Sequence, residues 1–289
     1  MRFRLPKNAG LRRNRRAVSP AISSVIITAA VVILVLVTMN FAVTLRDSKI
    51  AQNEFSSVMQ FMQAAAVQID DIAWVPLRTQ TFRYSRSYGS MSFIPNMELI
   101  FQIYFRNASG EYLLGSYNSG VLAYNMHISR YNMYDGYFEL IYPTDSSLSD
   151  CFIFSGANAP VARVYAVEKL STGPFVRLVL NPCIRIVEAN ISGKKQYRLY
   201  LPILYESSIR GNNPTVTFTS KLISSDAKNA TKIRILVKTP STFSTYDASF
   251  FVKSPQGPNT IVNKEIDLGG FATVVFYIGV VEVSVGVNP

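Results

Sequence analysis

The uncharged stretch at residues 17–45 constrains this chain more than any other feature. A helix that spans a bilayer needs about 20 apolar residues, so this stretch is long enough to cross one. A secretory signal has a shorter apolar core of roughly 7–15 residues, followed by a small-residue cleavage site. No Ala-x-Ala site directly follows residue 45. We therefore predict a retained transmembrane helix at residues 18–45, in preference to a discarded signal or a buried core helix.

The charges before this stretch indicate its orientation. The tail is basic and contains no acid; its basic residues are Arg2, Arg4, Lys7, Arg12, Arg13, Arg15 and Arg16. Lysine and arginine next to a membrane span remain on the cytoplasmic side. We expect a single-pass protein in contact with membrane lipid, with a cytoplasmic N-terminus and its bulk outside the cell membrane. The net charge of +11 is then mainly a topology signal, and no clustered nucleic-acid-binding face is expected.

The junction between the tail and the apolar stretch has a recognisable sequence. Ser19 suits a helix N-cap, and Pro20 suits the first helical turn, where its missing N–H costs nothing. The string Arg16-Ala17-Val18-Ser19-Pro20, followed by the apolar run, resembles the N-terminus of archaeal type IV pilin-like proteins, which carry a class III signal peptide. The resemblance implies a prepilin peptidase that cuts between Ala17 and Val18. It also implies that residues 1–17 are a cleaved leader and that other pilin-like subunits are partners.

One position departs from the bacterial branch of that family. Bacterial pilins usually carry glutamate as the fifth mature residue, whereas this chain would carry Ile22. Archaeal members often lack that acid, so the departure is consistent with the archaeal branch.

Residues 46–75 predict an amphipathic extension of the same helix. One face is apolar at helical spacing, comprising Phe55, Val58, Met59, Met62, Ala65, Ala66, Ile69 and Ile72. Glu54, Gln60, Gln63 and Gln68 are expected on the opposite, polar side. The helix should run unbroken over residues 20–73 and end before Pro76. Asp70 and Asp71 near its end are interpreted as solvated or capping residues, with a catalytic carboxylate pair as the less favoured alternative.

From residue 76 onward the apolar pattern has a period of two, which predicts β-strands. Expected strands include residues 97–105, 175–180, 184–191, 197–205, 215–222, 232–239 and 248–254. The last valines, at 281, 283, 285 and 287, predict a half-buried C-terminal strand. The fold class is therefore α+β, with a long transmembrane and amphipathic helix followed by an antiparallel β-sandwich-type region. Residues 76–206 form one β-rich domain, and residues 207–289 form a second module or continue the same sandwich.

Residues capable of catalysis are scarce. The sequence has one histidine, His127, and no P-loop, Gly-x-Ser-x-Gly or dinucleotide fingerprint. We expect no enzyme activity, no metal and no cofactor. Cys151 and Cys183 would lie outside the cytoplasm, where a disulfide can persist; two buried thiols are the alternative.

N-glycosylation motifs occur at Asn107, Asn190 and Asn229, about as many as chance would supply. The expected function is that of a cell-surface pilin-like protein with a structural or adhesive role, as a minor pilin or tethered pseudopilin. A monomeric single-pass receptor or binding module is the alternative.

Overall fold

The computed structural model describes residues 19–133, 137–144, 152–168, 175–191, 193–239 and 259–287. A single long helix, α1 (Ser19–Ala73, 55 residues), is followed by a large sheet, so the α+β class is confirmed. The helix bounds also agree with the predicted span of residues 20–73. The chain divides into two compact units, Met1–Lys49 and Ile50–Pro289.

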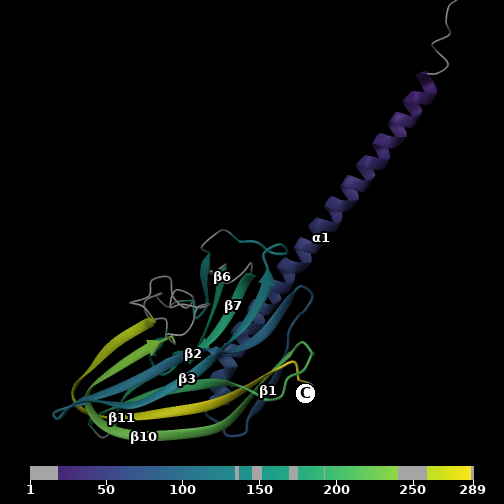
Figure 1. The fold of residues 1–289 in the computed structure, drawn as a ribbon. Helices are drawn as coiled ribbons and strands as arrows, with labels where there is room; N and C mark the ends of the chain where they lie inside the picture. Colours follow the sequence, from purple (N-terminus) through teal and green to yellow (C-terminus); the bar gives the residue numbers. More distant parts are fainter. Residues whose placement is uncertain are drawn as a thin grey trace, which may run out of the picture. The chain divides into compact units, whose positions relative to one another are not determined.

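The strands of the second unit pair into one sheet, which has eleven strands among the described residues (Figure 1). Their bounds are β1 (Thr79–Arg83), β2 (Gly89–Asn107), β3 (Gly110–His127), β4 (Phe138–Tyr142), β5 (Ile153–Ser155), β6 (Ala162–Glu168), β7 (Phe175–Pro182), β8 (Ile184–Ile191), β9 (Lys194–Glu206), β10 (Thr215–Lys238) and β11 (Thr260–Val285). The order is β4-β6-β7-β3-β2-β10-β11-β9-β8-β5, and β1 also pairs with β10. Most neighbours are antiparallel. The β9–β11 and β5–β8 pairs are parallel, so the sheet is mixed.

The strand β10 joins two runs that the sequence predicted as separate strands. Residues 215–222 and 232–239 fall at its two ends, and the polar residues between them continue the strand. These central residues are mostly exposed, and their backbone pairs with β11, which runs alongside as an equally long curved strand (Figure 1). The strand thus continues through this polar stretch because its backbone pairs with β11, although its side chains are not buried. The predicted run at residues 248–254 lies outside the described residues.

The C-terminal strand occupies an interior position in the sheet. β11 pairs with β10 on one side and with β9 on the other, although β9 and β10 are consecutive in the chain. Val281 and Val283 are 0% and 1% exposed, and Val285 and Val287 are partly buried. The predicted half-buried strand is thus confirmed as far as Val285, where β11 ends. Gly286 then lies against the loop between β9 and β10, because its carbonyl oxygen accepts a hydrogen bond from Asn213 N at 3.0 Å.

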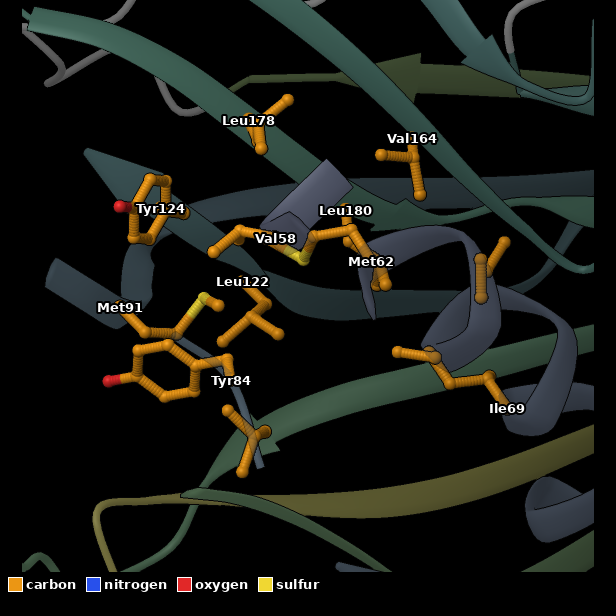
Figure 2. Close-up of a cluster of buried hydrophobic side chains, with 14 of the residues drawn as sticks. Val58, Met62, Ile69, Tyr84, Met91, Leu122, Tyr124, Val164, Leu178 and Leu180 are labelled. Atoms are coloured by element: carbon orange, nitrogen blue, oxygen red, sulfur yellow. The ribbon is translucent and has the colours of Figure 1, made fainter. Parts of the chain in front are cut away.

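The amphipathic part of α1 packs on this sheet. Its predicted apolar face is buried, including Phe55, Val58, Met62, Ala65, Ala66, Ile69 and Ile72, whereas Met59 is partly buried. Val58 and Met62 lie near side chains of β3, β6 and β7, and Ile69, further along the helix, belongs to the same core (Figure 2). The strand residues of this core include Leu122, Tyr124, Val164, Leu178 and Leu180. Burial of each large apolar side chain contributes about 1.5–3 kcal/mol, so this face fixes the helix on the sheet.

A second hydrophobic core lies away from the helix. It contains Leu99, Phe101, Ile103 and Phe105 of β2. Residues of β9, of the C-terminal half of β10 and of β11 from Ile261 to Ile278 also belong to it. The long strands β10 and β11 contribute to both cores: Val216 and Phe218 belong to the helix-bound core, and Ile233 and Ile235 to the second. One continuous sheet therefore includes strands from both residues 76–206 and residues 207–289.

We predict that removing residues 282–289 lowers the free energy of unfolding of the full-length chain by several kcal/mol. The deletion removes the buried Val283 and the end of a strand that pairs on both sides, and each buried valine contributes about 1.5–3 kcal/mol. Denaturant unfolding in detergent micelles measures the effect. In a matched pair, Val283→Ala should cost more than Val287→Ala, because Val287 is only partly buried. Equal stability of the truncated and intact chains would contradict the central placement of β11.

Candidate functional site

The first part of α1 has the surface of a membrane-spanning segment. The segment is long and apolar enough to cross a bilayer, and its large apolar side chains are exposed within this unit. The hydroxyls of Thr28, Thr38 and Thr44 donate to the carbonyl oxygens of Ser24, Leu34 and Asn40 at 2.7–2.9 Å. These bonds satisfy polar groups inside the helix, as apolar surroundings require.

One of the buried charged groups of the second unit is the Glu54 carboxylate. Glu54 is 3% exposed, although the sequence placed it on the polar side of the helix; that expectation is wrong. Its Oε1 accepts from Ser87 N at 2.8 Å and Gly89 N at 3.2 Å, and its Oε2 accepts from Tyr88 N at 2.9 Å. A buried carboxylate is tolerated only when such donors replace water. Glu54 thereby ties the loop before β2 to the helix.

Tyr124 supplies a fourth donor from β3. Its hydroxyl donates to Glu54 Oε1 at 2.7 Å. Burial, followed by the hydrogen bond to Glu54 and the nearby negative charge, raises the pKa of Tyr124 above its ordinary value. The phenol therefore keeps its proton and remains a donor. A Cβ on Gly89 would lie 2.1 Å from the Tyr124 hydroxyl oxygen, so only glycine at this position admits the tyrosine.

The C-terminal end of α1 is held by a separate polar contact. Asp70 accepts from Trp74 Nε1 at 2.7 Å and from Arg185 Nη1 at 2.6 Å. The Arg185 side chain is 11% exposed, and its guanidinium lies 4.7 Å from the Tyr200 ring centroid. Asp71 instead pairs with Arg78 at 3.5 Å. The two aspartates thus bind different arginines, an arrangement that fits attachment of the helix end better than carboxylate-pair chemistry.

The residues expected from the sequence to carry processing or redox chemistry are mostly outside the described part of the chain. Arg16, Ala17, Val18 and Cys151 all lie there. Cys183 is buried between β7 and β8, and Asn181 Nδ2 lies 3.8 Å from its Sγ. The processing site and the disulfide therefore stay predictions.

The single histidine is accounted for by local contacts. His127 Nδ1 lies 2.8 Å from Ser129 Oγ and accepts from Ser129 N at 3.1 Å, and its ring packs edge-on against Phe175. Across the described residues, no group of three or more histidine, cysteine or acidic side chains is arranged to hold a metal ion.

The sheet register brings the three glycosylation motifs to one end of the sheet. Asn107 ends β2, Asn190 pairs with Lys195 of β9, and Asn229 pairs with Thr273 of β11. The asparagines at 190 and 229 are exposed, whereas Asn107 is partly buried and its Oδ1 accepts from Ser109 N at 2.9 Å. The three asparagines are far apart in the sequence, and strand pairing brings them to the same end of the sheet.

We predict that Glu54→Gln lowers the free energy of unfolding by about 2–4 kcal/mol, because the amide loses an acceptor and turns a donor toward backbone N–H groups. Tyr124→Phe should cost less, about 1–2 kcal/mol, since it removes one donor and leaves the carboxylate bound. The exposed Glu188→Gln is the control and should change stability by less than about 0.5 kcal/mol. Denaturant unfolding of the full-length chain tests this series, and an unchanged Glu54→Gln variant would refute the role of the carboxylate.

Comparison with known proteins gives no external guide to this site. No protein-family model, curated protein or solved structure matches the chain. The functional interpretation therefore depends on the chain's own residues and on the contacts described above.

Proposed function

We propose that this chain is a membrane-anchored, archaeal type IV pilin-like surface protein with a structural or adhesive role. One observation carries the proposal: a single helix, α1, has an exposed apolar segment and an amphipathic segment buried on a sheet. A pilin-like subunit needs both properties in one helix, since the helix serves as membrane anchor and as the support of the outer domain. The resemblance at Arg16–Pro20 supports the same function from the sequence.

In this proposal the N-terminus is cytoplasmic and the sheet-rich unit is outside the membrane. A prepilin peptidase removes residues 1–17, and the apolar segment remains in lipid until other pilin-like subunits replace the lipid. Small and slim residues allow close helix packing in apolar surroundings; they are Ser23, Ser24, Thr28, Ala29 and Ala30. Ile22 has no charge that could pair with the N-terminal amino group of a neighbouring mature subunit. Helix packing between subunits therefore depends on van der Waals contact. We therefore assign the chain as a minor or tethered subunit.

A second candidate is a monomeric single-pass binding module. A hollow of about 500 Å³ beside the turn between β8 and β9 favours it, because a purely structural subunit has no need of such a site. The two candidates differ in assembly. Co-expression with the peptidase and assembly machinery, followed by imaging of the cell surface, separates them: filaments containing the chain support the pilin-like function, and detergent-soluble monomers alone support the module.

We predict that the mature protein begins at Val18 and keeps its apolar segment. N-terminal sequencing of protein from membranes that contain a prepilin peptidase measures the start. Arg16→Glu should leave the precursor uncut, because the cut requires the basic and small pair that precedes it. Arg2→Glu, a charge change far from the cut, is the matched control and should be processed normally.

Two outcomes would contradict this prediction. A mature start beyond Val43 would identify an ordinary secretory signal and remove the anchor. An intact Met1 in mature protein would leave a plain signal anchor, and the pilin-like proposal would lose its main support.

A further inference from the structure

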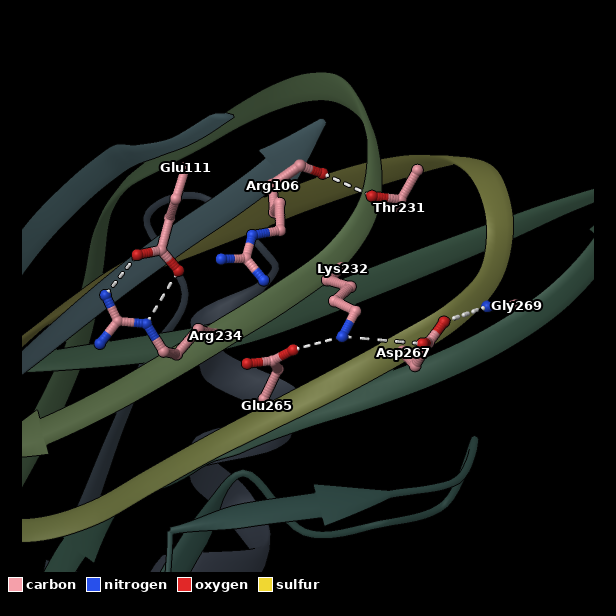
Figure 3. Close-up of polar contacts among 8 residues, drawn as sticks. All are labelled: Arg106, Glu111, Thr231, Lys232, Arg234, Glu265, Asp267 and Gly269. Carbon is pink, nitrogen blue, oxygen red and sulfur yellow. Dashed lines mark hydrogen bonds and ion pairs between the residues drawn. The ribbon is translucent and has the colours of Figure 1, made fainter. Parts of the chain in front are cut away.

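β11 bulges outward opposite Thr231 of β10. Ala230 pairs with Ala272, whereas Lys232 pairs with Asp267, so four residues of β11 face one residue of β10. The bulge contains Gly269 and Gly270 at φ of 69° and 135°, a backbone region that favours glycine. Asp267 Oδ1 accepts from Gly269 N at 2.8 Å and fixes the bend (Figure 3).

A hollow of about 500 Å³ lies between this bulge and the turn that joins β8 to β9. We call it the rim hollow and define it by the lining residues Lys194, Lys195, Asn229, Gly270, Phe271 and Thr273. Phe271 is 69% exposed, whereas Leu268 at the start of the bulge is 1% exposed and anchors it in the second core. The bulge therefore holds a large apolar ring in solvent beside a concave polar surface.

The rim hollow contains two lysines, Lys194 and Lys195, whose positive charges are at most weakly neutralised by the residues that the structure describes. Nearby cations on β10 are paired: Lys232 Nζ lies 2.7 Å from Glu265 Oε1, and Arg234 binds Glu111 through two hydrogen bonds (Figure 3). Lys194, by contrast, makes no ion pair with any residue that the structure describes. Lys195 pairs only with Glu188, at 3.5 Å, and both side chains are more than half exposed, so solvent weakens the attraction.

The lining also offers hydrogen-bonding groups of both kinds. Thr273 Oγ1 donates to Asn229 Oδ1 at 3.0 Å, and the Asn229 side chain also carries an amide NH₂ donor. No Cβ covers Gly270, and a Cβ placed there would meet nothing within 4 Å, so a ligand can approach the backbone of the bulge.

We propose that the rim hollow binds an acidic saccharide, a chain of sugar rings that carry carboxylates. The lysine ammonium groups would pair with a carboxylate, and Asn229 and Thr273 with ring hydroxyls. Phe271 would cover the apolar C–H face of a sugar ring. A concave polar lining suits such a solute better than a flat lipid surface. The biological role of this binding, adhesion to an envelope or surface polysaccharide, rests on the outward placement of the sheet-rich unit proposed above.

Calorimetric titration of the full-length chain in detergent micelles with oligogalacturonate tests the proposal. We expect saturable binding that weakens as salt is added, because ion pairs at an exposed site are screened. A malto-oligosaccharide of the same length, which lacks carboxylates, should bind much more weakly. Phe271→Ala and Lys194→Gln should each raise the dissociation constant about fivefold, which is the size expected for one ring contact or one exposed ion pair.

Matched variants outside the rim hollow control for general surface effects. Leu222→Ala removes another exposed apolar side chain and Lys221→Gln another surface lysine, both on β10, and neither should change binding. Unchanged thermal unfolding of all four variants would show that folding is intact, since all four side chains are exposed.

Three results would overturn the proposal: no binding of oligogalacturonate, equal binding of polyglutamate, or binding that the Phe271 and Lys194 variants do not alter. A glycan attached to Asn229 in protein from native membranes would fill the rim hollow and overturn it as well. Because binding is measured in micelles, it depends on neither membrane orientation nor processing at Val18. A failure here would therefore leave the anchor proposal standing.

Discussion

The buried carboxylate of Glu54 connects the helix to β2 and β3 of the sheet. It lies on the helix, accepts from three consecutive backbone N–H groups at the start of β2, and accepts from Tyr124 on β3. Hydrophobic burial along Val58, Met62 and Ile69 supplies most of the attraction between helix and sheet, but that attraction has little direction. The hydrogen bonds to Glu54 have strict geometry, so they set where along the sheet the helix lies.

Much of the helix and many of the strand segments could be predicted from the sequence, because they follow local periodicity. The apolar face of α1 and the bounds of β8 agree with their patterns. Glu54 could not be predicted, since its burial depends on donors more than 30 residues away. The strand β3 was missed because its first half is largely exposed, and the length of β10 was missed because polar residues interrupt its apolar pattern. The rim hollow depends on the register between strands and on the β11 bulge. Neither can be predicted from one segment of the sequence.

The two long strands β10 and β11 contribute to two hydrophobic cores within one sheet. Near residues 216–218 and 281–283 the strands support the helix, and near residues 233–235 they enclose the second core. The rim hollow lies at the β11 bulge, which belongs to the part of the strands around the second core. Asp267 and Ala272, on either side of the bulge, pair with β10, and Thr273 pairs with Gln196 of β9. Paired strand backbone therefore positions Lys194 and Thr273, and the paired residues that flank the bulge hold the two ends of the segment that carries Phe271.

The position of β11 also determines when the sheet can be completed during synthesis. β9 and β10 leave the ribosome before β11. The edge of each strand that faces β11 in the folded sheet therefore stays unpaired until β11 inserts between them. Until then both strands expose unpaired backbone and apolar side chains, the features that promote aggregation. Because synthesis proceeds from the N-terminus, the sheet therefore stays unfinished until β11 has been made. Rapid insertion of β11 after its synthesis shortens the period during which these surfaces are exposed.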